Sequence, residues 1–127
     1  MAEFALVLPL FVLLLVGIID GGRMVFTSNH LAEAAREGAR WGSVQGRSAT
    51  DTTRDTIEAE TEARINGVGG VTVTATCERG GATVTPCHTG DILVVAVDAD
   101  FEFVTPFIGQ LIGIDELTAE SKVMVNQ

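Results

Sequence analysis

The residues of this sequence best placed to do chemistry are three carboxylates in its C-terminal third. Asp98, Asp100 and Glu102 alternate with apolar residues, so on a β-strand they would project from one face. Oxygen ligands of this kind can bind Ca²⁺. A strand, however, holds successive side chains on one face roughly 6–7 Å apart, and the sequence contains no EF-hand loop. We therefore predict a solvated acidic face and no metal site.

The two cysteines offer a second kind of chemistry. Cys77 and Cys87 flank a short polar segment, His88 is merely adjacent to Cys87, and His30 is far away in sequence, so zinc-finger spacing is absent. Two cysteines around such a loop predict one local disulfide and an oxidising compartment. A pair of reduced, buried thiols is the alternative. Closing a loop of this size would stabilise the fold by roughly 2–3 kcal/mol.

The rest of the sequence carries no recognisable catalytic pattern. It has no Ser/His/Asp constellation, no nucleophile elbow, no phosphate-binding loop and no tyrosine. The net charge of −9 argues against a nucleic-acid-binding protein, because phosphate binding needs clustered Lys and Arg. We predict neither an enzyme nor a cofactor, and no nucleic-acid partner.

The element that dominates the sequence is an apolar segment near the N-terminus. No charged residue lies between Phe4 and Ile19, and every Lys, Arg, Asp and Glu except Glu3 lies at or beyond Asp20. The segment could be a signal-peptide core, a membrane span or a permanently buried helix. A signal peptide has a basic leader, whereas this leader is acidic. As a helix the segment would rise about 24 Å, slightly less than a ~30 Å hydrocarbon core. Being apolar on all sides, it must be surrounded by lipid or by copies of itself.

Three features affect this predicted helix. Glu3 places a carboxylate at its head, where the helix macrodipole stabilises it but lipid makes it costly unless it is paired; a position in the headgroup layer is the alternative. Pro9 removes one backbone hydrogen bond, and Gly17, Gly21 and Gly22 lower the helix propensity. We expect a kink or local unwinding near one of these sites.

The helix should continue past the apolar segment to about Trp41. Within this continuation Ala34, Gly38 and Gly42 recur every four residues on one face. Small residues at this spacing let another backbone come close, which predicts packing against a neighbouring helix or against the domain's own sheet. An ordinary helix surface is the alternative.

Beyond a break at Gly46 the pattern changes twice. Thr50–Ile65 has a plausible N-cap and mixed charges, which predicts a second, amphipathic helix. From Val71 the apolar residues alternate with a period of two, typical of half-buried strands, and Gly80-Gly81 marks a turn. The predicted strands are Val71–Cys77, Asp91–Phe103 at the centre, and Leu117–Val125. Pro106–Ile114 is an apolar connection that either caps the sheet or meets a neighbouring subunit.

Together these elements predict an α+β fold. It comprises a long N-terminal apolar helix, a second amphipathic helix, and a small antiparallel β-sheet of about three or four strands with one disulfide. We divide the chain into an N-terminal hydrophobic helix, residues 1–45, and a small extracellular α+β globular domain, residues 46–127.

Two segments of the sequence carry a resemblance to a known family. AEFALVLPLFVLLLVGIIDGGR (Ala2–Arg23) and AAREGARWGSV (Ala34–Val44) resemble the TadE-like pilins of tight-adherence (Tad/Flp) pilus systems, in the acid before an apolar run, the LP within it, the G-I-I-D-x-G-R exit and the A-R-E-G-A-R block. VTPFIGQLIG (Val104–Gly113) and the last strand are also similar. The family's acid usually lies at the fifth mature position, whereas Glu3 is third here.

The resemblance implies a role in a type IV-like filament. Family members are made as prepilins, cut by a membrane prepilin peptidase, held in the inner membrane by the helix, and then extracted into or onto the tip of a filament. Glu3 would carry the role of the acid that pairs with the terminal amine of a neighbouring subunit.

We therefore predict a structural pilin-like subunit that polymerises through its N-terminal helix into a Tad-type extracellular filament for surface attachment. The alternatives are a minor TadE-type pseudopilin and a static membrane-anchored binding module of the cell envelope. The predicted partners are copies of itself or other pilins, the inner membrane before assembly, and the prepilin peptidase. The residues predicted to make the assembly contacts are Glu3, Phe4, Leu6, Leu8, Pro9, Phe11, Leu13, Leu14, Leu15, Ala34, Gly38 and Gly42.

Overall fold

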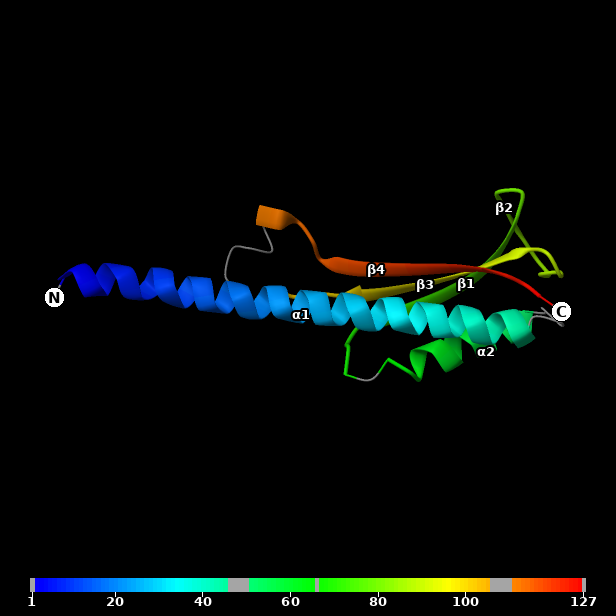
Figure 1. Ribbon diagram of the computed structural model, residues 1–127, viewed down its shortest axis with the longest axis horizontal. Helices are drawn as coiled ribbons and strands as arrows, with labels where there is room; N and C mark the ends of the chain where they lie inside the picture. Colours follow the sequence, from blue (N-terminus) through cyan, green and yellow to red (C-terminus); the bar gives the residue numbers. More distant parts are fainter. Residues whose placement is uncertain (1, 46–50, 66, 106–110, 127) are drawn as a thin grey trace.

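A long helix projects from a small α+β domain in the computed structural model (Figure 1). The structure describes residues 2–45, 51–65, 67–105 and 111–126. It contains the predicted N-terminal helix, a second helix, a four-stranded antiparallel sheet and one disulfide. The predicted fold class is thereby confirmed.

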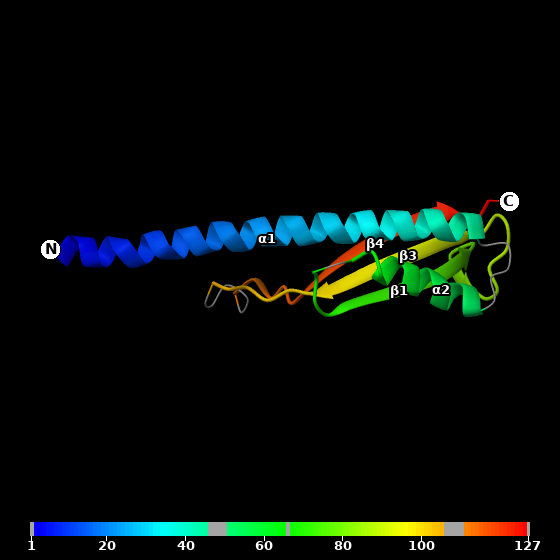
Figure 2. The same cartoon turned by 90° about the horizontal axis from the view of Figure 1, so that it is seen from below.

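Helix α1 (Ala2–Gln45) is a single helix of 44 residues, about 66 Å long at 1.5 Å per residue. It runs without interruption through Pro9 and through Gly17, Gly21 and Gly22, so the expected local unwinding is not present. The helix also extends beyond Trp41. Figure 2 shows that its N-terminal half stands clear of the domain, whereas its C-terminal half lies along it.

The sheet has the strand order β2-β1-β3-β4, and all three pairs are antiparallel. The turn predicted at Gly80-Gly81 joins β1 to β2, a short strand that the periodicity did not predict. Both glycines have positive φ, 60° and 84°, as a two-residue hairpin turn requires. The strand bounds are β1 Val71–Arg79, β2 Ala82–Val84, β3 Ile92–Asp100 and β4 Glu116–Met124.

All three predicted strands differ from the structure at their ends, and β1 extends two residues beyond the predicted Cys77, to Arg79. The central strand β3 ends at Asp100 and not at Phe103, because its neighbours end there: Ala99 pairs with Val71, the first residue of β1, and Asp100 pairs with Glu116, the first residue of β4. The last strand is displaced by one residue toward the N-terminus relative to the prediction.

Helix α2 (Asp51–Glu62) is shorter than predicted. Its last residues leave the helical pattern, since the amides of Arg64 and Ile65 donate to the carbonyls of Thr61 and Glu62, three residues back. Tighter bonds of this kind are common at helix ends.

The core lies between the sheet and the two helices. The C-terminal half of α1 packs on β3 and β4, and α2 packs on β1 and beside α1. Leu31, Val95 and Val97 are completely buried there. The second half of α1 therefore contributes to the same core as the sheet. The other members of the cluster are Ala34, Ala35, Ala39, Ile57, Ile65, Ala75, Cys77, Cys87, Leu93, Ala99, Phe101, Leu117 and Val125.

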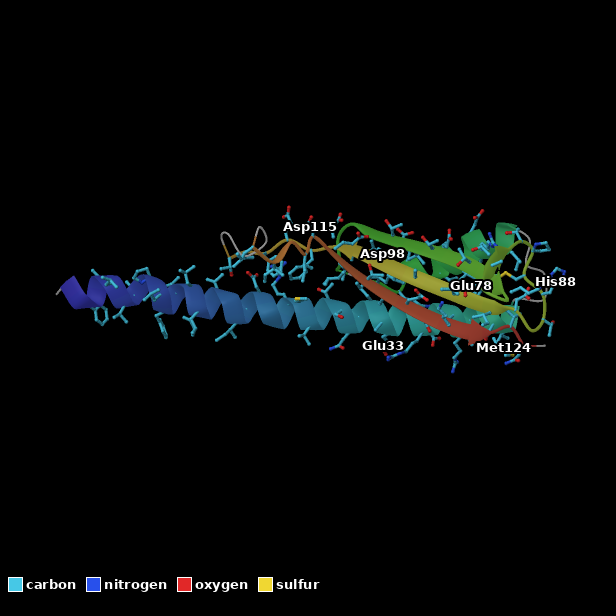
Figure 3. All side chains as sticks on the ribbon, turned by 90° about the horizontal axis from the view of Figure 1, so that it is seen from above. Glu33, Glu78, His88, Asp98, Asp115 and Met124 are labelled. Carbon is cyan, nitrogen blue, oxygen red and sulfur yellow. A yellow bond between two sulfur atoms is a disulfide. The ribbon has the colours of Figure 1, made fainter. Side chains whose placement is uncertain are left out.

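The opposite face of the sheet is polar. Asp98 is half-buried there, and Asp100 and Glu102 are exposed; Figure 3 labels Asp98 and Glu78 along this sheet. Lys122 on β4 lies 3.6 Å from Glu78 and 3.0 Å from Glu120, so a cation partly balances the acidic side chains. In the described part of the chain no group of three or more His, Cys, Asp or Glu residues is arranged to hold a metal ion.

Candidate functional site

The candidate site is the part of α1 that stands clear of the domain in the described structure, which we call the bare half (Phe4–Ile19). The helix that contains it, Phe4–Val44, is long and apolar enough to cross a membrane. The large side chains of the bare half are exposed over 44% to 75% of their surface, except Val16, which is half-buried. Of the residues predicted to make assembly contacts, this stretch contains Phe4, Leu6, Leu8, Pro9, Phe11, Leu13, Leu14 and Leu15, all of them exposed.

Glu3 precedes the bare half. Its backbone belongs to α1, while its side chain lies outside the described part of the structure. Its proposed pairing with a neighbouring subunit stays a prediction.

The second group of predicted assembly residues lies in a different environment. Ala34, Gly38 and Gly42 face the chain's own domain: a Cβ on Gly38 would collide with the hydroxyl of Thr61 on α2, and a Cβ on Gly42 would lie 2.5 Å from Cδ2 of Leu93 on β3. The absence of side chains therefore lets α2 and β3 approach α1 closely. In the single chain these residues pack within the domain, and their role in assembly stays a prediction.

Asp20 lies where the bare half ends, and it joins the helix to a segment far away in the sequence. Its side chain is almost fully buried, at 2% exposure. Oδ1 accepts a hydrogen bond from the amide of Val104 (3.1 Å). Oδ2 accepts one from the amide of Thr105 (2.7 Å) and one from its hydroxyl (2.6 Å). We call this arrangement the Asp20 clasp.

The clasp explains how the Asp20 carboxylate can be buried at the end of the apolar segment of α1. A buried charge is costly unless hydrogen bonds replace its hydration, and Asp20 has three close donors from residues 104–105. Arg23, one turn further along the helix, adds a more distant contact of 3.5 Å. Only Arg23 carries a charge among these donors, so neutral groups supply most of the compensation.

Arg23 also fixes the segment that follows β3. Its guanidinium donates to the carbonyl of Glu102 (3.5 Å) and lies 5.5 Å from the ring centroid of Phe101, within the range of a cation–π contact. Phe101 in turn packs edge-to-face on Phe103, with centroids 5.0 Å apart. The backbone from Phe101 to Thr105 is thus held against α1 by side chains of both segments.

A second buried carboxylate, Asp91, lies at the other end of the domain. Arg79 donates to both of its oxygens, at 2.6 and 2.7 Å, and the amide of His88 donates to Oδ2 at 2.7 Å. The hydrogen bonds from Arg79, followed by that from His88, lower the pKa of Asp91 from 3.8 to about 2. This cluster holds the segment that contains Cys87, which is bonded to Cys77 with the two Cα atoms 5.6 Å apart. The predicted disulfide is confirmed.

Neither buried aspartate was assigned a structural partner by the sequence analysis. The sequence feature that could have drawn attention to Asp20 is its position as the first charged residue after an apolar run. Its partners lie 84 and 85 residues away, and no local pattern predicts contacts at such a separation. Arg79 is the last residue of β1 and Asp91 directly precedes β3; because Glu78 pairs with Ile92, a correct register would have brought these two residues together.

The comparisons with known proteins agree with the arrangement of the N-terminal helix. The model of the family described as TadE-like protein matches residues 1–40, which confirms the resemblance over the bare half and most of the packed part of α1. The match suggests a pilin-like protein associated with a tight-adherence pilus, and the apolar helix suggests a membrane anchor. Neither the curated proteins nor the solved structures give a match.

Proposed function

We propose that this chain is a structural subunit that polymerises through the bare half of α1 into a type IV-like, Tad-type extracellular filament for surface attachment. The observation that carries the proposal is the exposure of the bare half, where twelve large apolar side chains are 44% to 75% exposed in the described structure. Water is an unfavourable environment for such a surface, so it requires lipid or other protein helices.

The size of the side chains supports a strong lateral interface. Burial of one Leu or Phe side chain contributes roughly 1.5–3 kcal/mol, and Phe4, Leu6, Leu8, Phe11 and Leu14 are each more than half exposed. Full burial of these five would contribute roughly 7.5–15 kcal/mol, comparable with the association cost of roughly 4–15 kcal/mol, and the other exposed side chains of the bare half add to it. Because the bare half extends beyond the domain (Figure 2), neighbouring copies can pack their bare halves together while their domains remain outside the helical core.

The same helix would serve two environments in turn. Before assembly it would be held in the inner membrane, where a prepilin peptidase would process the chain, and it would then move into the filament, with Glu3 pairing with a neighbouring subunit. These partners are proposed from the TadE-like resemblance. Lipid and a bundle of apolar helices are both hydrocarbon environments, so the transfer does not expose the bare half to water.

Electron microscopy of filaments sheared from cells, with subunits identified by mass spectrometry, tests the proposal. We expect this chain to be the main component of thin filaments. If the filaments consist of another subunit while this chain is scarce in them, it is a minor pseudopilin. If it stays entirely in the membrane fraction, it is a static anchor and polymerisation is contradicted.

A further inference from the structure

The connection between β3 and β4 forms an apolar projection at the end of the domain nearest the bare half. Figures 1 and 2 both show this connection continuing past the end of the sheet toward the N-terminal half of α1. Three of its described side chains are large, apolar and exposed: Val104 at 64%, Leu111 at 87% and Ile112 at 52%. We call these three residues the apolar tip. Residues 106–110 lie outside the described part of the chain.

We propose that the apolar tip inserts into the lipid surface while the bare half spans the membrane, so that the domain is seated on the bilayer at two points. This inference rests on the membrane-held stage of the proposed function. It assigns lipid, and not a second protein copy, as the partner of the tip.

The Asp20 clasp determines the level of the tip relative to the membrane. The amides of Val104 and Thr105 bond directly to Asp20, the first charged residue after the apolar run that ends at Ile19. If Phe4–Ile19 fills the hydrocarbon core, Asp20 lies at its boundary with the headgroups. The start of the connection is then held at this boundary, where exposed aliphatic side chains are favourable only if they enter the acyl region.

The position of the tip within the domain supports the same partner. At the opposite end, Figure 3 places His88 and Met124 far from the bare half, whereas Asp115, which directly precedes β4, lies at the near end. Val25 and Phe26 of α1, each 62% exposed, follow Asp20 and Arg23 along the helix. Val44, Ile92 and Met124 at the far end are exposed as well, so the apolar tip is distinguished by its place beside the bare half and not by its exposure alone.

Size and charge favour lipid over a protein partner. Three aliphatic side chains are far too few for a stable protein interface, which buries about 1,200–2,000 Å². Contact with lipid does not need so large an area. The membrane-spanning helix already holds the tip at the bilayer surface, so the effective concentration of lipid around the tip is high. The exposed carboxylates Glu102, Asp115 and Glu116 nearby oppose attraction to anionic headgroups. We therefore expect insertion into neutral lipid, with little dependence on salt.

Quenching of tryptophan fluorescence by brominated acyl chains tests the proposal in the full-length chain reconstituted in phosphatidylcholine vesicles. The unsubstituted chain, whose single tryptophan is Trp41, supplies the background. Leu111→Trp probes the tip, Phe11→Trp probes the bare half, and Met124→Trp is the matched exposed control at the far end of the domain. Circular dichroism confirms that each variant folds.

We expect brominated lipid to reduce the emission of the added tryptophan at residues 111 and 11, roughly by half for a side chain inserted 5–10 Å, and to leave that at residue 124 unchanged. Quenching at residue 11 without quenching at residue 111 would overturn the inference and leave the proposed anchoring intact. A blue-shifted but unquenched emission at residue 111 would assign the tip to a protein partner and would also overturn it. Equal quenching at residues 111 and 124 would show unspecific adsorption of the domain. Quenching at neither 11 nor 111 would contradict the membrane-held stage itself, and the inference with it.

Discussion

Along α1, the half from Phe4 to Ile19 carries mostly large, exposed side chains, whereas the half from Leu31 to Ser43 carries mostly small ones that pack on the domain. Leu14 is 60% exposed, but Ala35 and Ala39 are almost completely buried. In one continuous helix, side-chain size is thus inversely related to contact with the chain's own domain. Small residues bring α2 and the sheet close, and large ones remain available for an external apolar partner.

The boundary between these halves is chemically different from the far end of the domain. Asp20 is bonded mainly to neutral donors of residues 104–105, while Asp91 is bonded to the guanidinium of Arg79. Both are buried carboxylates, but only the second belongs to an ion pair with two short hydrogen bonds. Because the close donors to Asp20 are neutral, the burial of this carboxylate beside the bare half depends little on the more distant charge of Arg23.

The largest effect should follow from placing a charge in the bare half. Leu14→Asp should abolish filament assembly, since a carboxylate at the centre of an apolar helix costs about 2.5–3.5 kcal/mol in lipid and more than one copy would carry it in a filament. The same applies to Leu13→Asp. Because neither side chain contacts the domain, the thermal unfolding midpoint (Tm) should not change.

Val44→Asp is the matched control for this prediction. Val44 lies on the same helix and is 75% exposed, but it stands at the domain end. Assembly is measured by filament yield in electron microscopy, and the Tm by circular dichroism in detergent. Filaments of normal yield from Leu14→Asp would show that the bare half is not the polymerisation surface.

A smaller effect should follow from breaking the disulfide, at the end of the domain farthest from the bare half. Dithiothreitol, or replacement of Cys77 and Cys87 by Ala, should destabilise the domain by roughly 2–3 kcal/mol. Association through the bare half should persist, because no part of it contacts the disulfide. Denaturant unfolding of oxidised and reduced chains measures the difference, and an unchanged free energy of unfolding would contradict it.

The same substitution at two glycines of α1 should have opposite effects. Gly42→Ala inserts a methyl group 2.5 Å from Cδ2 of Leu93 and 2.9 Å from Cδ1 of Ile57, and such overpacking costs typically about 1–3 kcal/mol. Gly21→Ala meets nothing within 4 Å, so the better helix propensity of Ala should stabilise it by about 0.5–1 kcal/mol.

Chemical denaturation of both glycine variants in detergent provides the measurement. Because both variants replace Gly by Ala, any difference between their changes in the free energy of unfolding reports the surroundings of each glycine. Equal free energies of unfolding for Gly42→Ala and Gly21→Ala would contradict the difference between the close packing at Gly42 and the open surroundings of Gly21.

The smallest effect should appear in the thermal stability at acidic pH. The pKa of Asp91 is lowered to about 2 from 3.8, so its contribution to stability is complete above the unfolded value and is lost as the pH falls from about 4 toward 2. Asp91→Asn should therefore have a lower Tm than the parent chain at pH 7, and the difference should diminish at pH 2.

Asp55→Asn, at an exposed position on α2, is the control for the acid experiment and should follow the parent profile closely. Thermal melts between pH 2 and 7 give the comparison. A difference between Asp91→Asn and the parent that is constant with pH would contradict the role assigned to the ion pair.

Much of the fold could be predicted from local sequence. The apolar run predicted the N-terminal helix, and the alternation of Val and Thr from Val71 predicted β1, because both patterns depend only on near neighbours. The end of β3 could not be predicted, since the alternation continues to Phe103 and only the ends of β1 and β4 terminate the pairing. The local unwinding expected near Pro9 or near Gly17, Gly21 and Gly22 is absent, as the helix is continuous there.

The candidate site divides in the same way. The exposed residues of the bare half could be predicted from hydropathy alone, because no other segment of the sequence offers enough apolar surface to cover them. The positions of Gly38 and Gly42 against Thr61 and Leu93 required the packing of α2 and β3 to be known. The Asp20 clasp required a contact between residues more than eighty positions apart, which sequence spacing does not encode.

The continuity of α1 has a geometrical consequence for any assembly. A regular α-helix turns by about 100° per residue, so an unbroken helix that is held at Asp20 and along its packed half has no rotational freedom relative to the domain. Leu13 and Val16, seven and four residues before Asp20, lie on the same azimuth as the clasp. The half-burial of Val16 agrees with this orientation. Packing of the bare half would therefore determine the direction in which each domain points around the filament axis, without any contact between the domains themselves.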